Sequence, residues 1–222
     1  HNAYILTGIR GVGKTTTARI ISKAINCNKH FEHGVQQNNE VYCECDGITK
    51  SNHIDVLEMD AASKTGVDDI RDLLESSKYH PSVAKYKVFI IDEAHMLSKQ
   101  AFNALLKTLE EPPGHLKFIL ATTEIKKIPI TILSRCQRFD LKRIKIEEMI
   151  KFLTDISNKE DIKIDNNAIQ IIAKSSEGSV RDALSILDQA NIINIEKKNI
   201  SAENIRKMIG LADKDKLLAL IT

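Results

Sequence analysis

The first part of the chain alternates short apolar runs with segments of helical periodicity. Between the runs, apolar residues recur at helical spacing, as in 16–25 and in 101–109, which ends before Pro112-Pro113. Strands that alternate with helices predict right-handed βαβ units and a parallel sheet covered by helices. The runs that we interpret as buried strands are 3–7, 54–59, 86–91 and 116–121.

Two helix starts carry capping signatures. Thr65-Gly66-Val67-Asp68 fits the S/T-x-x-D/E pattern and predicts a helix that runs to about Ser77. Ser179-Val180-Arg181-Asp182 fits the same pattern ahead of a helix over 180–193.

The pattern changes near Arg143, and beyond it only helical periodicity remains. The helical segments are 146–157, 166–175, 180–193 and 202–209. The sequence therefore predicts an α/β domain over 1–143, a small all-helical domain over 144–210, and the start of a third domain at 211–222.

Composition limits the class of protein without defining it. The 222 residues are 42% hydrophobic and 28% charged, as expected for a chain with a sizeable core. A net charge of +2 means that nucleic-acid binding would need a local basic patch. No apolar run approaches the ~18 residues of a membrane helix, so we expect no membrane partner. The cysteine pattern favours the reducing cytoplasm.

The segment Gly8–Thr15 reads GIRGVGKT and fits the phosphate-loop pattern G-x-x-x-x-G-K-[ST] between a strand and a helix. Its glycines allow a sharp turn that aims backbone N–H groups at phosphate oxygens, and the helix N-terminus adds partial positive charge. Lys14 is expected to reach the β- and γ-phosphates, and the Thr15 hydroxyl to bind Mg²⁺. We expect nucleotide contacts from Gly8, Arg10, Gly11, Val12, Gly13, Lys14, Thr15 and Thr16.

A second acidic motif ends the 86–91 strand. Asp92 would hold Mg²⁺, and Glu93 would polarise the attacking water. This strand lies one strand–helix unit beyond the phosphate loop, so we expect the two strand tips to be neighbours in the sheet. Thr122 and Thr123 end the next strand, either as a γ-phosphate sensor or simply because β-branched residues favour strands.

Further motifs bring a resemblance to a known family. Together with the phosphate loop, they are Asp60–Ser63, Ile91–Leu97, Ala104–Pro113, Ser134-Arg135-Cys136 and Gly178–Asp182. Over nearly its whole length the chain resembles the clamp-loader ATPases, which are AAA+ proteins. The resemblance implies a three-layer αβα fold with a helical lid, and an ATP-hydrolysing motor subunit that loads a sliding clamp on primed double-stranded DNA. Its other partners would be clamp-loader subunits in a hetero-oligomeric ring.

The resemblance also implies roles that spacing cannot show. Arg135 would be an arginine finger that acts on the ATP of a neighbouring subunit. Arg181 would contact the γ-phosphate of its own subunit's ATP, and Thr122 or Thr123 would fill the sensor position. Catalysis would thus involve Lys14, Asp92, Glu93 and Arg135.

The polar stretch 26–52 departs from the family pattern. Members of the family carry four cysteines here that form a Zn²⁺ site, whereas this stretch contains Cys27, Cys43 and Cys45 only. Cys43-Glu44-Cys45 is a C-x-C, tighter than usual zinc spacing. Either His30 or His33 supplies a fourth ligand, or the cysteines are thiols without a metal.

Two partner surfaces follow from the resemblance alone. Lys64 corresponds to a position that faces DNA, and Tyr79-His80-Pro81 to a segment that contacts the clamp. Exposed lysine and tyrosine side chains are also typical of an ordinary protein surface that binds no partner.

Three alternatives remain open. A replication factor C-like small subunit shares the loop and acids, although the cysteine-bearing insert favours the bacterial branch. A non-hydrolysing structural subunit of the same ring would not need Lys14-Thr15 and Asp92-Glu93, and a branch-migration helicase should lack Glu-Glu-Pro-Pro. Because the chain starts almost on its first strand, we expect a fragment that lacks an N-terminal segment, and the resemblance implies a C-terminal collar after Thr222.

Overall fold

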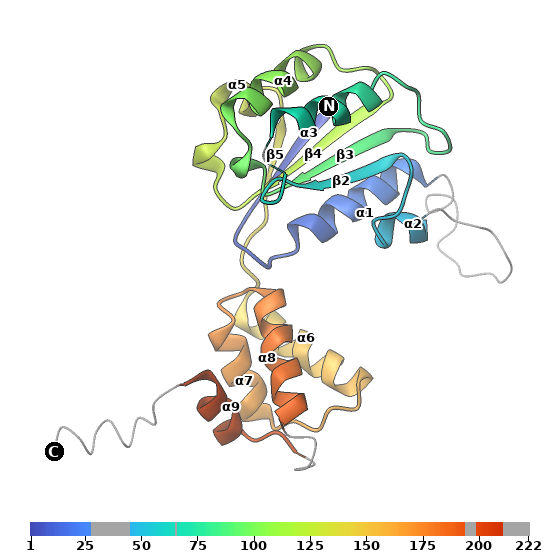
Figure 1. The fold of residues 1–222 in the computed structure, drawn as a ribbon. Helices are drawn as coiled ribbons and strands as arrows, with labels where there is room; N and C mark the ends of the chain where they lie inside the picture. Colours follow the sequence, from blue (N-terminus) through green and yellow to red (C-terminus); the bar gives the residue numbers. More distant parts are fainter. Residues whose placement is uncertain (28–44, 65, 194–198, 211–222) are drawn as a thin grey trace, which may run out of the picture. The chain divides into compact units, whose positions relative to one another are not determined.

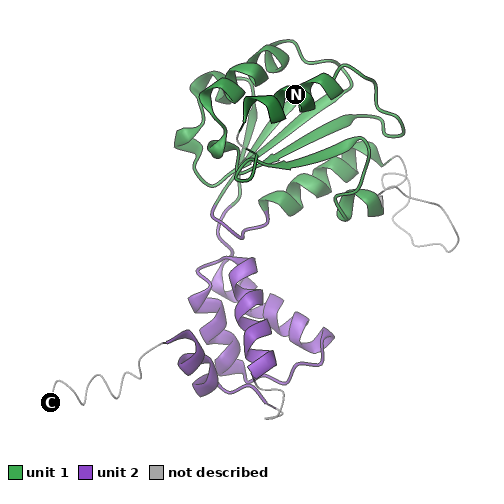
Figure 2. Cartoon of the chain, viewed as in Figure 1, with its two compact units in different colours: residues 1–8, 14–141 green, residues 9–13, 142–222 purple. Residues whose placement is uncertain are grey.

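The computed structural model describes residues 1–27, 45–64, 66–193 and 199–210 (Figure 1). The chain divides into two compact units, one formed by 1–8 with 14–141 and the other by 9–13 with 142–222 (Figure 2). The division after Leu141 lies near the boundary expected at 143. The expected third domain, 211–222, lies outside the described residues.

The first unit is built on a parallel sheet with the strand order β2-β3-β4-β1-β5. Four strands coincide with the predicted apolar runs. The fifth, β5, was missed because its four residues are all exposed and form no apolar run. The strands are β1 (Ala3–Thr7), β2 (Val56–Asp60), β3 (Lys87–Asp92), β4 (Leu116–Thr122) and β5 (Gln137–Asp140).

Helices cover both faces of this sheet, which confirms the predicted three-layer arrangement. One face carries α1 (Lys14–Asn26) and the short α2 (Cys45–Thr49), and the other carries α3 (Val67–Ser76), α4 (Lys99–Glu110) and α5 (Ile130–Leu133) (Figure 1). Two short 3₁₀ turns, η1 (Ala94–Met96) and η2 (Ile125–Lys127), follow β3 and β4.

The period-2 alternation of β3 explains the two layers of core. Phe89 and Ile91 pack into the core beneath α3, α4 and α5, whereas Val88 and Ile90 pack with α1 and α2. All four side chains are fully buried, as expected for a central parallel strand.

One local prediction was wrong. Strand β4 lies between β1 and β3, so the tips of β1 and β3 are not neighbours in the sheet. The helix expected from the Thr65–Asp68 signature is present as α3, which begins at Val67 after Gly66; the predicted cap residue Thr65 itself lies outside the described residues.

The second unit is helical, as predicted. Met149, Leu153, Ile172, Ala183 and Leu187 are among the fully or almost fully buried residues of its single core. The predicted cap of the third helix is confirmed, because the Ser179 hydroxyl accepts a hydrogen bond from the Asp182 N–H (3.3 Å). The helices are α6 (Ile146–Lys159), α7 (Asn166–Ser175), α8 (Val180–Ile193) and α9 (Ala202–Ile209).

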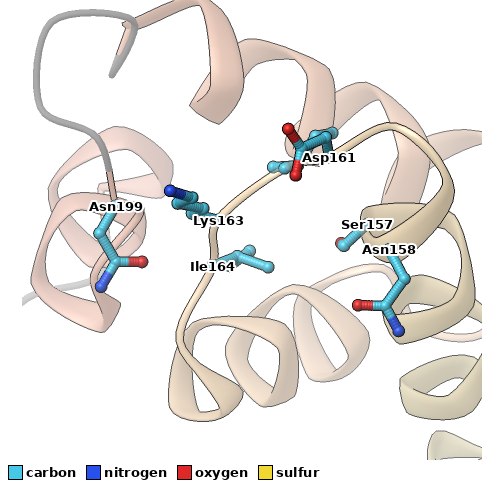
Figure 3. A pocket seen from close by; sticks show the side chains of 7 residues that line it. Ser157, Asn158, Asp161, Lys163, Ile164 and Asn199 are labelled. Atoms are coloured by element: carbon cyan, nitrogen blue, oxygen red, sulfur yellow. The ribbon is translucent and has the colours of Figure 1, made fainter.

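A polar pocket of about 560 Å³ opens after α6 in this helical unit (Figure 3). Ser157 lines it, and the buried hydroxyl of Ser157 has no hydrogen-bond partner among the described residues. None of the residues expected to bind nucleotide or metal lines this pocket.

In the described part of the chain, no helix is long and apolar enough to cross a membrane.

Candidate nucleotide site

The phosphate loop leads from β1 into α1, as its sequence predicts. Gly11 (φ 75°) and Gly13 (φ 97°) have left-handed backbone, which glycine adopts at little cost. At the loop tip, the Gly11 carbonyl accepts hydrogen bonds from the Val180 and Arg181 N–H groups (3.0 and 3.3 Å). A Cβ added at Gly11 would lie 2.1 Å from the Ser179 hydroxyl, so this close approach requires glycine.

Lys14 begins α1 and is 5% exposed. Its Nζ donates to the Gly8 carbonyl (3.2 Å). Burial lowers the pKa of Lys14, and the negative charges of Glu93 and Asp92 counteract that shift only in part. The result is a nearly buried cation held beside two acids.

Thr15 and Asp92 meet although 77 positions separate them. The Thr15 hydroxyl donates to Asp92 Oδ2, and Asp92 Oδ1 accepts from the Glu93 N–H (2.8 Å). A hydroxyl and a carboxylate oxygen facing each other are hard oxygen ligands of the kind that Mg²⁺ takes at phosphate sites. The donor set therefore fits the expected metal.

Glu93 follows β3 in a left-handed backbone conformation (φ 45°, ψ 43°), which is strained for a residue other than glycine. Its Oε2 accepts a hydrogen bond from the Thr123 hydroxyl (3.1 Å) and lies 3.3 Å from His95 Nδ1. The Thr122 hydroxyl faces His95 Nδ1 instead (3.1 Å). Of the two candidate sensors, only Thr123 contacts Glu93.

Arg135 lies in the turn between α5 and β5, in a polar setting. Its guanidinium donates to Glu110 Oε1 (2.6 Å) and to the Thr131 carbonyl (2.8 Å). The neighbouring Cys136 packs against the core, and burial raises the pKa of its thiol to about 11. Cys136 is therefore a packing residue, while Arg135 remains exposed.

The other expected nucleotide contacts are spread along the loop and α8. Arg10 and Thr16 are exposed, and Gly8 and Val12 are half-buried. Arg181 occupies the first turn of α8 and is exposed.

The predicted zinc site is not supported. Cys43, His30 and His33 lie outside the described residues, Cys45 begins α2, and Cys27 follows α1. Across residues 1–27, 45–64, 66–193 and 199–210, no group of three or more histidine, cysteine or acidic side chains is arranged to hold a metal ion.

The expected partner residues are accessible. Lys64 is exposed after β2, and Tyr79, 73% exposed, begins the segment that includes His80 and Pro81.

Sequence reasoning missed His95, which joins Glu93 to the end of β4. The motif Asp92–His95 was visible, but periodicity gives no sign that the histidine turns back toward Glu93. That direction is set by the short η1 turn, whose N-cap is Glu93 itself.

A phosphate loop whose Thr15 meets Asp92 on a parallel αβα sheet, followed by a helical lid, defines a P-loop protein of the AAA+ class. Solved structures of similar fold include the Holliday junction branch migration motor RuvB of Thermotoga maritima. That likeness has a TM-score of 0.64 at 19% identity and covers 95% of this chain and 61% of that chain. At this identity it shows the fold alone.

The family follows from sequence comparison. A family profile described as "DNA polymerase III, delta subunit" matches residues 1–145, and one described as "DNA polymerase III clamp loader subunit, ATPase lid domain" matches 148–193. The chain belongs to the family of DNA polymerase III clamp-loader subunits, in its gamma/tau branch.

Three curated relatives illustrate that placement. DNA polymerase III subunit tau of Escherichia coli is 46% identical over all of this chain, which spans 34% of the relative. Subunit gamma of Buchnera aphidicola (subsp. Baizongia pistaciae) is 44% identical over all of this chain, which spans 59% of it. Subunit tau of Bacillus subtilis is 52% identical over 85% of this chain and is matched over 33% of its own length.

Proposed function

We propose that this chain binds ATP with Mg²⁺ and hydrolyses the ATP as a motor subunit of a clamp loader. The meeting of Thr15 with Asp92, beside buried Lys14 and Glu93, carries the proposal. Nothing in the packing of the fold requires a hydroxyl, two acids and a buried lysine at one strand end. Binding a magnesium–triphosphate accounts for all four.

Each of these residues, together with Thr123, then has a role in the proposed reaction. Lys14 donates to the β- and γ-phosphates in place of its present bond to Gly8, and Thr15 and Asp92 hold the metal. When bound, Mg²⁺ neutralises charge that develops on the transferred phosphate. Glu93 accepts a proton from, or polarises, the attacking water, and Thr123 orients the Glu93 carboxylate.

Two arginines have further roles that rest on the family resemblance. Arg135 exchanges its bond to Glu110 for the triphosphate bound by a neighbouring subunit of the ring. Arg181 reads the γ-phosphate of its own nucleotide. Gly8, Arg10, Gly11, Val12, Gly13 and Thr16 complete the contacts to the nucleotide.

The partners in this proposal are other loader subunits, a sliding clamp and primed double-stranded DNA. ATP binding biases the ring toward a state that holds the clamp open around DNA, and hydrolysis releases the clamp. Exposed Lys64 contacts the DNA backbone, and the Tyr79–Pro81 segment contacts the clamp. We place this activity in the cytoplasm, where the bacterial chromosome is copied. The proposal includes no zinc.

The alternatives are less well supported. A non-hydrolysing ring subunit would not need to keep Lys14, Thr15, Asp92 and Glu93 together. A replication factor C-like subunit would share the nucleotide site, but the curated relatives named above are gamma and tau subunits. The domain boundaries at 143 and 210 are part of the same proposal.

The direct test uses Glu93→Gln in the full-length protein, assayed with and without clamp and primed DNA. We expect ATP affinity to be kept and turnover to fall by roughly 10²–10⁴-fold, the typical contribution of a general base. Retained turnover would remove Glu93 from its role. Absence of stimulation by both clamp and DNA would contradict the loader assignment. Arg135→Ala should lower turnover only in assembled rings.

A further inference from the structure

His95 is a nearly buried ionisable side chain next to Glu93. Its side chain is 7% exposed. One ring nitrogen, Nδ1, lies 3.3 Å from Glu93 Oε2 and 3.1 Å from the Thr122 hydroxyl. The other, Nε2, lies 3.4 Å from Glu124 Oε1. The ring therefore bridges the acid after β3 and the segment after β4.

The partners of His95 define which way its protons point. Carboxylates accept hydrogen bonds and do not donate them when ionised, so either contact becomes a hydrogen bond only if the ring nitrogen that faces it carries an N–H. A hydrogen bond from Lys127 lowers the pKa of Glu124, which therefore stays ionised beside Nε2. The Thr122 hydroxyl already accepts from the Glu124 N–H (3.0 Å), which fixes it against the ring. A proton on Nδ1 turns the contact with Glu93 into attraction, whereas a lone pair there would repel the carboxylate.

The Glu93 carboxylate requires side-chain contacts to fix its orientation. Its backbone is left-handed, and its side chain has several rotatable bonds, so the carboxylate is not fixed by secondary structure. The Thr123 hydroxyl donates to the same oxygen, Oε2, that faces His95. With the Thr123 hydroxyl donating to Oε2 and His95 Nδ1 lying 3.3 Å from it, Oε1 is left as the oxygen that can accept from water.

We propose that His95 is a positioning residue for ATP hydrolysis: its Nδ1–H holds Glu93 Oε2, so that Oε1 is directed at the attacking water. This inference rests on the proposed function, in which Glu93 is the general base. The polar contacts of His95 are with Glu93, Thr122 and Glu124 and not with the phosphate loop Gly8–Thr15, so its effect is expected on the chemical step and not on nucleotide binding. An error of about 1 Å in the position of a catalytic group is enough to lower rates by orders of magnitude.

Three substitutions separate the two sides of the ring. In His95→Asn the amide can donate from the place of Nδ1 toward Glu93, in His95→Gln it can donate from the place of Nε2 toward Glu124, and His95→Ala removes both contacts. Each variant is made in the full-length protein and assayed for ATP turnover in the assembled complex with clamp and primed DNA. Nucleotide affinity and urea unfolding are measured on the same samples.

We expect His95→Ala and His95→Gln to lower kcat about tenfold or more with KM and ATP affinity unchanged, and His95→Asn to stay within about threefold of wild type. In a Glu93→Gln background, His95→Ala should cause no further loss, because the group that His95 positions is already disabled. His115→Asn is the matched control: His115 contacts the Ser77 carbonyl (3.1 Å) before β4 and should leave turnover unchanged.

Several results would overturn the inference. They are retention of activity by His95→Gln with loss in His95→Asn, equal loss in all three variants that follows their loss of stability, or a further decrease in the Glu93→Gln background. If Glu93→Gln itself keeps turnover, the proposed function fails. If Glu93→Gln collapses turnover while His95→Ala does not lower it, only the role of His95 fails.

Discussion

The amino ends and the carboxyl ends of the strands β2 and β3, called here the amino edge and the carboxyl edge, each carry a carboxylate. The two carboxylates have different hydrogen-bond partners. Asp55 precedes β2 at the amino edge, and Asp92 ends β3 at the carboxyl edge. Both are acidic residues next to a buried strand, and the sequence alone does not separate their roles. Their partners in the structure do.

At the amino edge, Asp55 is an acceptor for backbone only. It is 1% exposed, and its oxygens accept from the Ser82, Val83 and Ala84 N–H groups (2.8, 2.8 and 2.9 Å). Burial alone would raise the pKa of Asp55, but these three hydrogen bonds outweigh it and lower the pKa. Such an acid fixes the loop ahead of β3 and has little capacity left for a ligand.

At the carboxyl edge, Asp92 is held by a side-chain hydroxyl and by the next N–H, beside a buried lysine and a left-handed glutamate. A hydroxyl can turn from donating to a carboxylate toward binding a metal next to it, whereas three backbone N–H groups in a packed loop cannot. The contrast teaches that the kind of partner, a side-chain hydroxyl that is able to exchange or a row of backbone N–H groups that is not, separates the acid proposed to bind a metal from the acid that fixes a loop.

The largest expected effect separates activity from stability at the carboxyl edge. Asp92→Asn should lower ATP turnover by about 10³-fold, because in the proposed site Asp92 is a ligand of the Mg²⁺ that neutralises charge on the transferring phosphate. The free energy of unfolding should change by less than about 1 kcal/mol. Removing the negative charge of Asp92 relieves its repulsion with Glu93, which offsets the weakened hydrogen bonds. Steady-state ATPase assays and urea unfolding check both values; a large loss of stability would erase the contrast with Asp55.

The matched substitution at the amino edge should do the reverse. Asp55→Asn should lower the free energy of unfolding by about 2–4 kcal/mol, because an amide cannot accept all three hydrogen bonds and places N–H against N–H. Turnover measured below the unfolding temperature should stay within about twofold of wild type. If turnover fell as it does in Asp92→Asn, the amino edge would have to be counted in the nucleotide site.

The pH dependence sharpens the role of Asp55. Its pKa is lowered in the folded state relative to about 3.9 in the unfolded chain, so its stabilisation is complete above that value and is lost as the pH falls through the folded-state pKa. The difference in unfolding free energy between wild type and Asp55→Asn should therefore narrow below about pH 4. A difference that stays constant from pH 7 to pH 3 would show that the carboxylate charge is not what holds the loop.

The smallest expected effect concerns the threonine that holds Glu93. Thr123→Val keeps the shape and removes the donor to Glu93 Oε2, so kcat should fall about tenfold with little change in stability. The control is Asn26→Ala at the amino edge, where the Asn26 amide exchanges hydrogen bonds with the Tyr86 backbone (2.8 and 3.1 Å). It should cost about 1 kcal/mol of stability and leave kcat unchanged. The prediction fails if the kcat of Thr123→Val is not lower than the kcat of Asn26→Ala.

Much of the fold was predictable because its buried strands are continuous apolar runs. Strand β3 could be placed from the run Tyr86–Ile91 alone, and the four helices of the second unit from their periodicity. Strand β5 could not, because an exposed edge strand of four residues carries no burial pattern. Strand order is a long-range property: nothing in the local sequence indicates that β4 inserts between β1 and β3.

The candidate site was predictable where chemistry depends on residue type at fixed spacing, as in Gly8–Thr15. It was not predictable where the chain turns back on itself. The contact of Glu93 with His95 depends on a left-handed residue and a single 3₁₀ turn, for which glutamate is an atypical start. The pairing of Arg135 with Glu110 also joins distant segments and left no signal in either one.

The exposed strand β5 has a consequence for how copies of this chain can associate. Its outer side carries backbone N–H and C=O groups that no strand covers in the described sheet, which is the usual template for strand addition and aggregation. Here the strand is only four residues long, and Arg138 and Asp140 form an ion pair along it (2.6 Å). A short, charged edge is a poor template for a second strand. Self-association through a continuous sheet is thereby discouraged, and contacts with other chains are left to side-chain surfaces, where recognition can be selective.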